Sequence, residues 1–194
     1  PEMREDMGEI EAAEKNKIPK LIELKDLSGF FHCHTTASDG RATLDEMVAA
    51  AKERGYHFIG ISDHSQSARY AGGLTPADLK KQWAAIDALN QKQNGIFVFK
   101  GTESDIHADG GLDYPDAVLK GFDFVVISVH GHFNQDMKTA TARVCKAIAH
   151  PATRILGHPT GRLLLARDGV PLDFEQVIDT AVKYDVAIEI NANP

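Results

Sequence analysis

Side chains that commonly bind metal ions recur along this 194-residue chain, and most of them come directly after a short apolar run. The set comprises five histidines and two carboxylates: His32, His34, Asp39, His64, Glu103, His130 and His158. Imidazole and carboxylate groups bind divalent cations, and seven ligands exceed what one tetrahedral zinc ion needs. Two or three ions held close together suit phosphoryl chemistry, because they activate water, orient a phosphate and stabilise the leaving oxygen. The residues therefore predict a metal centre that hydrolyses phosphate esters.

Each candidate also has a plainer interpretation when it is taken alone. The His32-x-His34 pair places both imidazoles on one side of an extended segment, but a single such pair is a weak signal. Asp39 lies in a Ser-Asp-Gly turn, where aspartate is common for conformational reasons. Asp63, next to His64, could orient a neighbouring imidazole or cap the following loop. Arg162 could bind the substrate phosphate through its two-pronged guanidinium or could be a surface residue.

The elements that must position these side chains are short apolar strands alternating with amphipathic helices. The expected strands cover Phe30–Cys33, Phe58–Ser62, Ile96–Gly101, Phe124–Ser128, Ile155–Gly157 and Ala187–Ile190. Helices are expected from Thr43 to Gly55, from Thr75 with Pro76 in its first turn, over Thr139–Ala149 and over Phe174–Tyr184. Strand, loop and helix repeated in this order imply parallel strands in one α/β barrel, open or closed.

This arrangement of strands strengthens the case that the candidate residues bind metal. In a barrel of parallel strands all carboxyl ends of the strands share one face, so residues far apart in sequence meet in one cavity. Each of the first five predicted strands is followed by at least one of the candidates. We therefore expect the seven side chains to converge, and Glu103 and His130 to bind one ion or two adjacent ions.

Composition narrows the class of protein further. The formal net charge of −7 argues against a general duplex-DNA binder, although bound cations would supply positive charge locally at a phosphodiester. Cys33 and Cys145 suggest neither a disulfide framework nor a thiolate zinc site, so a reducing cytoplasm is the simplest compartment. A charged first segment and the absence of long apolar runs predict neither a signal peptide nor membrane insertion.

The combined motifs resemble a known superfamily from residue 29 onward. The segments HCHTTASDG, ISDHS, GTESDI, DFVVISVH, ILGHPTGRLL and EINANP resemble the polymerase and histidinol phosphatase (PHP) superfamily. More narrowly, PEMREDMGEIEAA, GGLDYPDAVL, GHPTGRLL and EINANP are similar to the C-terminal PHP domain of bacterial and archaeal family X DNA polymerases. The resemblance implies a distorted (β/α)7 TIM-like barrel with a centre of two to three divalent metals, either manganese or zinc, with iron as a further option. It also implies 3′–5′ exonuclease activity on DNA with a free 3′ end, in DNA repair.

Carried over motif by motif, the family's metal positions match the seven candidates named above. The family pattern continues to an Asp-x-His motif after a further strand, which lies beyond Pro194. We therefore expect residues 29–194 to form a PHP domain without its last strand, with an incomplete metal set and an edge near Ala187–Pro194 prone to self-association or disorder. Residues 1–28 would be an arm that follows a polymerase domain. The alternatives are a small-molecule phosphatase of the histidinol-phosphate type and a structural PHP module without activity.

Overall fold

Six parallel strands in sequence order form the central sheet of the part of the chain that the structure describes. The structure is a computed structural model that describes residues 8–92, 95–163 and 165–191. Each described strand pairs in parallel with the next along the chain. The strands are β1 (Gly29–Cys33), β2 (Phe58–Ile61), β3 (Phe97–Asp105), β4 (Phe124–Ser128), β5 (Thr153–Leu156) and β6 (Ala187–Ile188).

The helices begin where capping chemistry predicts. Thr43 and Thr75 each form a reciprocal capping box with the third residue of their helices, and Asp136 and Asp173 cap two others. The described helices are α1 (Glu9–Glu14), α2 (Leu44–Glu53), α3 (Pro76–Gln91), α4 (Asp116–Leu119), α5 (Met137–Ile148) and α6 (Phe174–Tyr184). Two short 3-10 helices, η1 (Leu24–Asp26) and η2 (Arg69–Ala71), were not predicted, and neither were α1 and α4. None of the described helices is long and apolar enough to cross a membrane.

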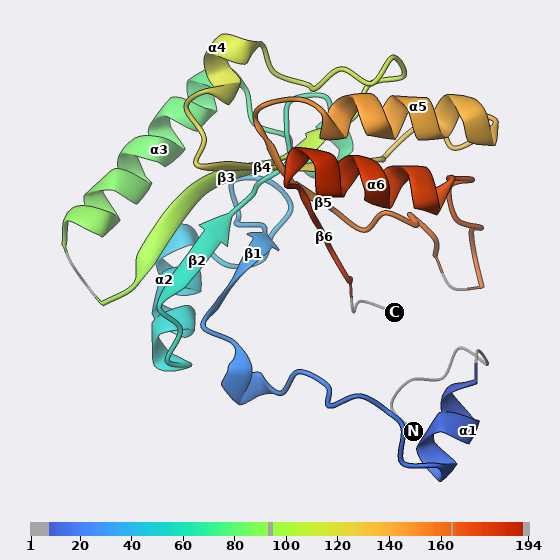
Figure 1. Cartoon of the computed structure of the whole chain (residues 1–194). Helices are drawn as coiled ribbons and strands as arrows, with labels where there is room; N and C mark the ends of the chain where they lie inside the picture. The colour runs from blue at the N-terminus through green and yellow to red at the C-terminus, as the bar shows by residue number, and fades with distance from the viewer. Residues whose placement is uncertain (1–7, 93–94, 164, 192–194) are drawn as a thin grey trace.

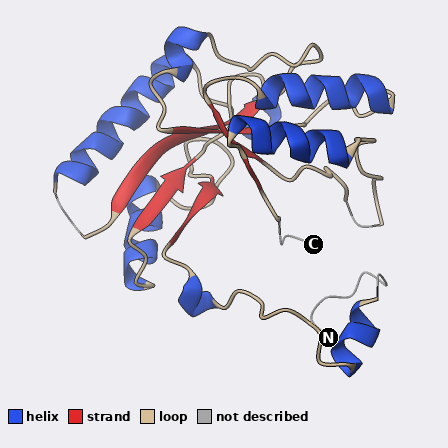
Figure 2. Cartoon of the chain, in the orientation of Figure 1, coloured by secondary structure: helices blue, strands red, loops and turns tan. Residues whose placement is uncertain are grey.

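The sheet curls into part of a barrel, with helices on its outer side (Figure 1 and Figure 2). The larger of two apolar cores lies beneath α5 and α6, which pack against each other, and the smaller one lies between α2, α3 and the first strands. This arrangement confirms the predicted partial TIM-like barrel of parallel strands. In Figure 1 the segment with α1 and η1 lies apart from the half-barrel, consistent with an arm.

Phenylalanine rings fill the inner side of the curled sheet. Phe31 contacts three other rings, with centroid separations of 5.3 Å to Phe58, 5.6 Å to Phe99 and 4.9 Å to Phe124. Gly60 leaves room for this packing, since a Cβ atom there would overlap the Phe31 and Phe124 rings. Aromatic rings at these separations attract one another, so the four rings stabilise the packing of the first four strands.

Two details of the sheet differ from the prediction. Strand β3 was expected to end at Gly101, but it continues to Asp105, and Glu103 therefore lies within the strand. The extension forms because residues 101–105 pair with the whole of β4. At the other end, β6 is shorter than predicted, and residues 192–194 of the expected sticky or disordered edge lie outside the described residues. Self-association through this edge stays a prediction.

Candidate metal centre

Glu103 is the centre of a cluster of five imidazoles. Its carboxylate is only 1% exposed. A ring nitrogen of each imidazole lies within 3.5 Å of one of its oxygens: His32 at 3.0 Å, His34 at 3.5 Å, His64 at 3.0 Å, His130 at 3.2 Å and His158 at 2.9 Å. Residues that are far apart in sequence thus converge where the strands end. The separation of 3.2 Å between His130 and Glu103 is close enough for a shared or adjacent ion.

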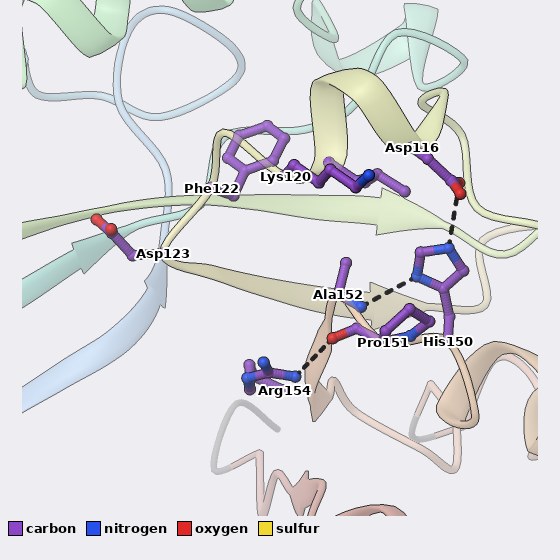
Figure 3. A pocket seen from close by; sticks show the side chains of 9 residues that line it. Asp116, Lys120, Phe122, Asp123, His150, Pro151, Ala152 and Arg154 are labelled. Atoms are coloured by element: carbon purple, nitrogen blue, oxygen red, sulfur yellow. Dashed lines mark hydrogen bonds and ion pairs between the residues drawn. The ribbon is translucent and has the colours of Figure 1, made fainter.

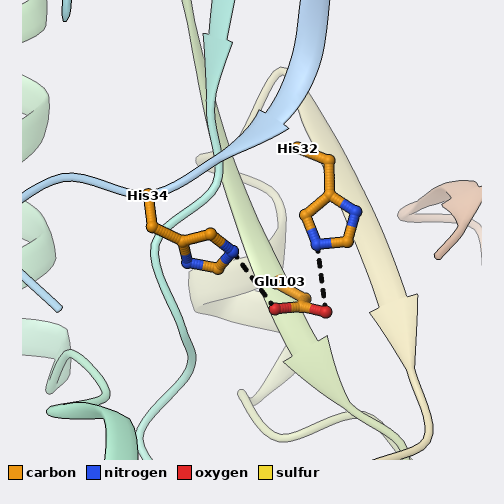
Figure 4. A group of neighbouring side chains, drawn as sticks. All are labelled: His32, His34 and Glu103. Atoms are coloured by element: carbon orange, nitrogen blue, oxygen red, sulfur yellow. Dashed lines mark ion pairs between the residues drawn. The ribbon is translucent and has the colours of Figure 1, made fainter. Parts of the chain in front are cut away.

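The H-x-H pair reaches this cluster by a route that simple strand alternation did not predict. Figure 4 shows His32 and His34 approaching different oxygens of Glu103 from the end of β1. The register of β1 against β2 shifts between Phe30 and Cys33, and His32 has a left-handed φ of 61°. A non-glycine residue in this region is strained and persists only where its surroundings fix it. The bulge, and not an extended strand, therefore aims the two imidazoles.

Asp39 completes the set from the loop after β1. Its carboxylate oxygens lie 3.6 Å from His34 Nδ1 and 3.5 Å from His64 Nε2. This position agrees with a ligand role and not merely with a turn. All seven predicted ligands are therefore brought together, and their metal binding is a prediction that the geometry supports.

Asp63 lies buried beneath that loop. Its carboxylate accepts hydrogen bonds from the Thr35 amide at 2.7 Å, the Thr35 hydroxyl at 2.8 Å, the Ser38 hydroxyl at 2.5 Å and the Gln82 amide at 2.6 Å. Asp63 therefore fixes the loop that leads to Asp39, and not the loop that follows Asp63, which the capping interpretation had predicted. Among the described residues, no imidazole forms a hydrogen bond with the Asp63 carboxylate.

Replacing Asp63 with alanine is expected to lower the free energy of unfolding of the metal-free chain by about 3 kcal/mol or more, because three buried donors and one half-buried donor would lose a charged acceptor. Urea unfolding in a chelator would measure this loss. Asp179→Ala, at an exposed position on α6, should change the free energy by less than about 0.5 kcal/mol. Equal losses in both variants would argue against the anchoring role.

Two carboxylates that orient imidazoles were missed by the sequence analysis. Asp105 Oδ1 lies 2.7 Å from His130 Nδ1, and Glu189 Oε1 lies 2.7 Å from His32 Nδ1. Glu189 also accepts a hydrogen bond from the backbone N–H of His158 at 2.7 Å. A carboxylate on the second ring nitrogen fixes the tautomer and direction of a metal-binding histidine. Asp105 could have been found from its spacing, since it lies two residues after Glu103 on the same face of β3.

The carboxylates control the charge of the cluster. Burial disfavours the imidazolium form of His32, but hydrogen bonds and charges from Glu103 and Glu189 outweigh it and raise the pKa of His32 to about 9. For His130, burial is likewise outweighed by Asp105 and Glu103, which raise its pKa to about 9. Burial lowers the pKa of His34. Although burial opposes it, hydrogen bonds from His130, His158 and His32 hold the pKa of Glu103 far below its ordinary value.

The cluster fits divalent cations because two of its buried ring nitrogens have no hydrogen-bond partner and could each bind a cation. The Nδ1 atoms of His34 and His64 are buried and have no hydrogen-bond partner, although His64 Nδ1 lies 3.0 Å from Glu103. A buried polar atom without a hydrogen-bond partner destabilises the fold unless a ligand binds it. Three overlapping groups have ligand atoms within 4.8 Å of one another: His32, His34 and Glu103; His34, Asp39 and His64; and His64, Glu103 and His130. Such a donor set suits more than one cation.

The remaining polar candidates are less closely tied to the cluster. Arg162 is exposed on the loop after β5, four residues beyond His158, and its phosphate-binding role stays a prediction. His150 lies 3.4 Å from Asp116 and His107 lies 3.4 Å from Asp113, so both have local acidic partners. Neither histidine belongs to the groups of potential metal ligands among the described residues.

A separate pocket lies at the opposite ends of the strands. It is lined by residues of α4, by the segments before β4 and β5, which include His150, and by Arg154 of β5 (Figure 3). Arg154 donates hydrogen bonds to the carbonyls of Pro151 and Thr153, and His150 pairs with Asp116. The pocket's histidine and this arginine are thus already engaged, and the pocket is remote from Glu103.

Comparison with known proteins agrees with this fold and site. The PHP domain family matches residues 31–193. The chain is 42% identical over its full length to the DNA polymerase/3′-5′ exonuclease PolX of Bacillus subtilis, of which it covers 34%. It is 35% identical over 166 residues to a probable phosphatase of Caldicellulosiruptor saccharolyticus, with 82% of this chain and 64% of that protein covered. The chain thus spans about a third and about two thirds of these relatives, respectively.

A solved structure shows the same fold at low sequence identity. Histidinol phosphate phosphatase from Lactococcus lactis, determined in complex with zinc, L-histidinol and phosphate, superposes with a TM-score of 0.59 and 15% identity. The match covers 84% of this chain and 73% of that protein. Fold and site together define a partial TIM barrel whose strand ends carry a cluster of potential metal ligands. The chain belongs to the PHP domain family of phosphoesterases.

Proposed function

We propose that this chain is a divalent-metal-dependent phosphodiesterase that removes nucleotides from DNA 3′ ends and forms part of a family X DNA polymerase. The observation that carries the hydrolase function is the buried Glu103 carboxylate with five imidazole nitrogens within 3.5 Å. The 42% identity to PolX along the whole chain supports DNA as substrate. In the reaction, a water oxygen bonds to phosphorus and the phosphorus–ester oxygen bond breaks.

The residues that would hold two or three manganese or zinc ions are Glu103, Asp39 and the five histidines that converge on these carboxylates. When bound, such cations supply activation of water and neutralisation of phosphate charge. Glu189 and Asp105 would keep His32 and His130 aimed at the cluster, and Asp63 would hold the loop of Asp39. Arg162 would bind the phosphate from the rim. By resemblance to the family, an Asp-x-His motif would add two further ligands.

The decisive experiment compares a ligand with a phosphate-binding residue, in the protein as its gene encodes it in full. His32→Ala should lower both metal content and cleavage of a labelled single-stranded oligonucleotide, because a ligand is lost. Arg162→Ala should lower cleavage about ten- to a hundredfold while metal content stays constant, because only substrate positioning suffers. Mass spectrometry of bound metal and gel assays give the two readouts.

Arg154→Ala is the matched control, since Arg154 is also exposed but lies at the opposite end of β5. It should leave both readouts unchanged. If Arg162→Ala behaves like this control, Arg162 does not bind phosphate. If metal chelation leaves oligonucleotide cleavage intact, the proposed metal-dependent function is wrong.

A small-molecule phosphatase is the second candidate function. The similarity to probable phosphatases and the shared fold with histidinol phosphate phosphatase favour it. A metal-loaded protein that ignores oligonucleotides but hydrolyses histidinol phosphate would establish this alternative. A protein that binds metals and cleaves neither substrate would favour a structural PHP module.

A further inference from the structure

Tyr70 stands at the mouth of the imidazole cluster without being part of it. The residue is 74% exposed, yet its ring centroid lies 6.2 Å from that of His64 and 6.4 Å from that of His130. Both imidazoles contact Glu103. The ring therefore borders the place where a phosphate would meet the metal centre, and most of its surface is free for another molecule.

The loop that carries Tyr70 is anchored on both sides of the ring. Ala68 and Ala71 are buried on either side of it within the turn of η2, which directs the tyrosine outward. The Leu74 amide donates to the His64 carbonyl at 2.8 Å and closes the loop. Gly73 permits this close return, because a Cβ atom there would overlap the Ser65 carbonyl.

Two acidic residues hold the same loop from below. The Ser67 amide donates to Asp113 Oδ2 at 2.7 Å, and its hydroxyl donates to Asp105 at 3.2 Å. Gln66 donates to the Asp113 carbonyl at 2.8 Å. Tyr70 is thus an aromatic ring on a pre-ordered support, so that contact with a ligand would cost little further conformational entropy.

The surroundings favour an uncharged, planar group against the ring. Asp39 and Asp105 near the mouth would repel a second phosphate there, whereas the face of a nucleobase carries no net charge. Aromatic side chains beside a nucleic-acid cleft stack on bases without regard to sequence, since every base has a π-face.

We propose that Tyr70 is a specificity residue that stacks on the base of the 3′-terminal nucleotide and so selects nucleotide-bearing phosphodiesters. This inference rests on the proposed function. The ring, and not the hydroxyl, would make the contact, and a phosphodiester without a base at its end would gain nothing from it.

The test uses two labelled single-stranded oligonucleotides that differ only at the 3′ terminus, one ending in thymidine and the other in an abasic tetrahydrofuran residue. Tyr70→Ala should raise the KM for the thymidine-ended substrate at least about fivefold, the lower end of what losing one stacked base costs. It should leave kcat, metal content and the KM for the abasic substrate unchanged. Tyr70→Phe should match the wild type, as should the control Tyr184→Ala on α6.

Each contrary result has a distinct meaning. Equal losses on both substrates, or a loss of bound metal, would show that Tyr70 supports the site instead of reading a base, and would overturn the inference. A Tyr70→Phe variant as impaired as Tyr70→Ala would assign the contact to the hydroxyl and overturn it as well. Binding measured by fluorescence anisotropy separates the two proposals: affinity for thymidine ends that depends on Tyr70 without any cleavage would support stacking while the exonuclease function fails.

Discussion

Glu103→Gln is expected to remove metal binding and to lower phosphoesterase activity by about a thousandfold or more, since the metal ions supply several kcal/mol of transition-state stabilisation. Glutamine preserves the size of the side chain but lacks the negative charge that faces five imidazoles. The site would then offer a neutral amide oxygen where divalent cations need a carboxylate. The loss of one negative charge would also weaken the attraction between the site and the cations. Metal content by mass spectrometry and kcat/KM on an oligonucleotide would measure the two effects.

Two further substitutions, Glu189→Gln and Glu175→Gln, should reduce metal binding less than Glu103→Gln does. Glu189 touches the cluster only through His32 and the backbone of His158, so its substitution should cost about ten- to a hundredfold in metal affinity. Glu175 is exposed in the first turn of α6, and its substitution should have no effect on metal. A Glu103→Gln protein that keeps its full metal content would exclude Glu103 as a ligand.

The metal-free chain is expected to lose stability as the pH rises from 6.5 to 9. The pKa of His32 and that of His130 are raised to about 9 in the folded chain, above the ordinary value of 6.5. A group with a raised folded pKa contributes stability that is complete below its unfolded pKa and disappears as the pH rises through the folded pKa. The loss in the free energy of unfolding should be on the order of a few kcal/mol for each group, because a tenfold change in the proton affinity of one group corresponds to about 1.4 kcal/mol.

Metal should reverse this trend. Cations bind the neutral imidazoles and compete with protons, so the gain in melting temperature on adding Mn²⁺ should grow over the same pH range. Melting curves recorded with Mn²⁺ and with a chelator at about pH 6.5, 7.5 and 8.5 would show the two slopes diverge. His32→Gln should flatten both slopes, whereas His57→Gln, at an exposed position before β2, should leave them unchanged. Parallel slopes with and without metal would contradict the competition.

Much of the fold follows from local sequence signals. Thr43, Thr75 and Pro76 begin their helices as capping chemistry predicts, and Gly55 follows the end of α2 with a left-handed φ of 78°. Such signals act between residues a few positions apart and can be read directly. The end of β3 could not be read in this way, because its last residues are polar and stay in the strand only through pairing with β4.

The same contrast holds for the metal centre. Convergence of the seven candidate ligands could be predicted because parallel strands share one carboxyl end. The bulge at His32 could not, because its left-handed φ reflects the surrounding packing and not an intrinsic preference of histidine. The role of Glu189 depends on β6 lying next to β5, a contact between residues 31 positions apart at His158. Tertiary neighbours of this kind have no local sequence signal.

Strand β3 carries packing and chemistry on one face. Phe97, Phe99, Gly101, Glu103 and Asp105 alternate along it, so the rings inside the barrel and the central carboxylate follow a single period of two. Inserting or deleting one residue between Phe99 and Glu103 would turn Glu103 and Asp105 toward the helices while Phe97 and Phe99 kept their side. Length change should therefore be tolerated in the loops of this protein but not in β3. Descendants of this sequence can change the lengths of the surrounding loops only while the spacing from Phe97 to Asp105 stays fixed.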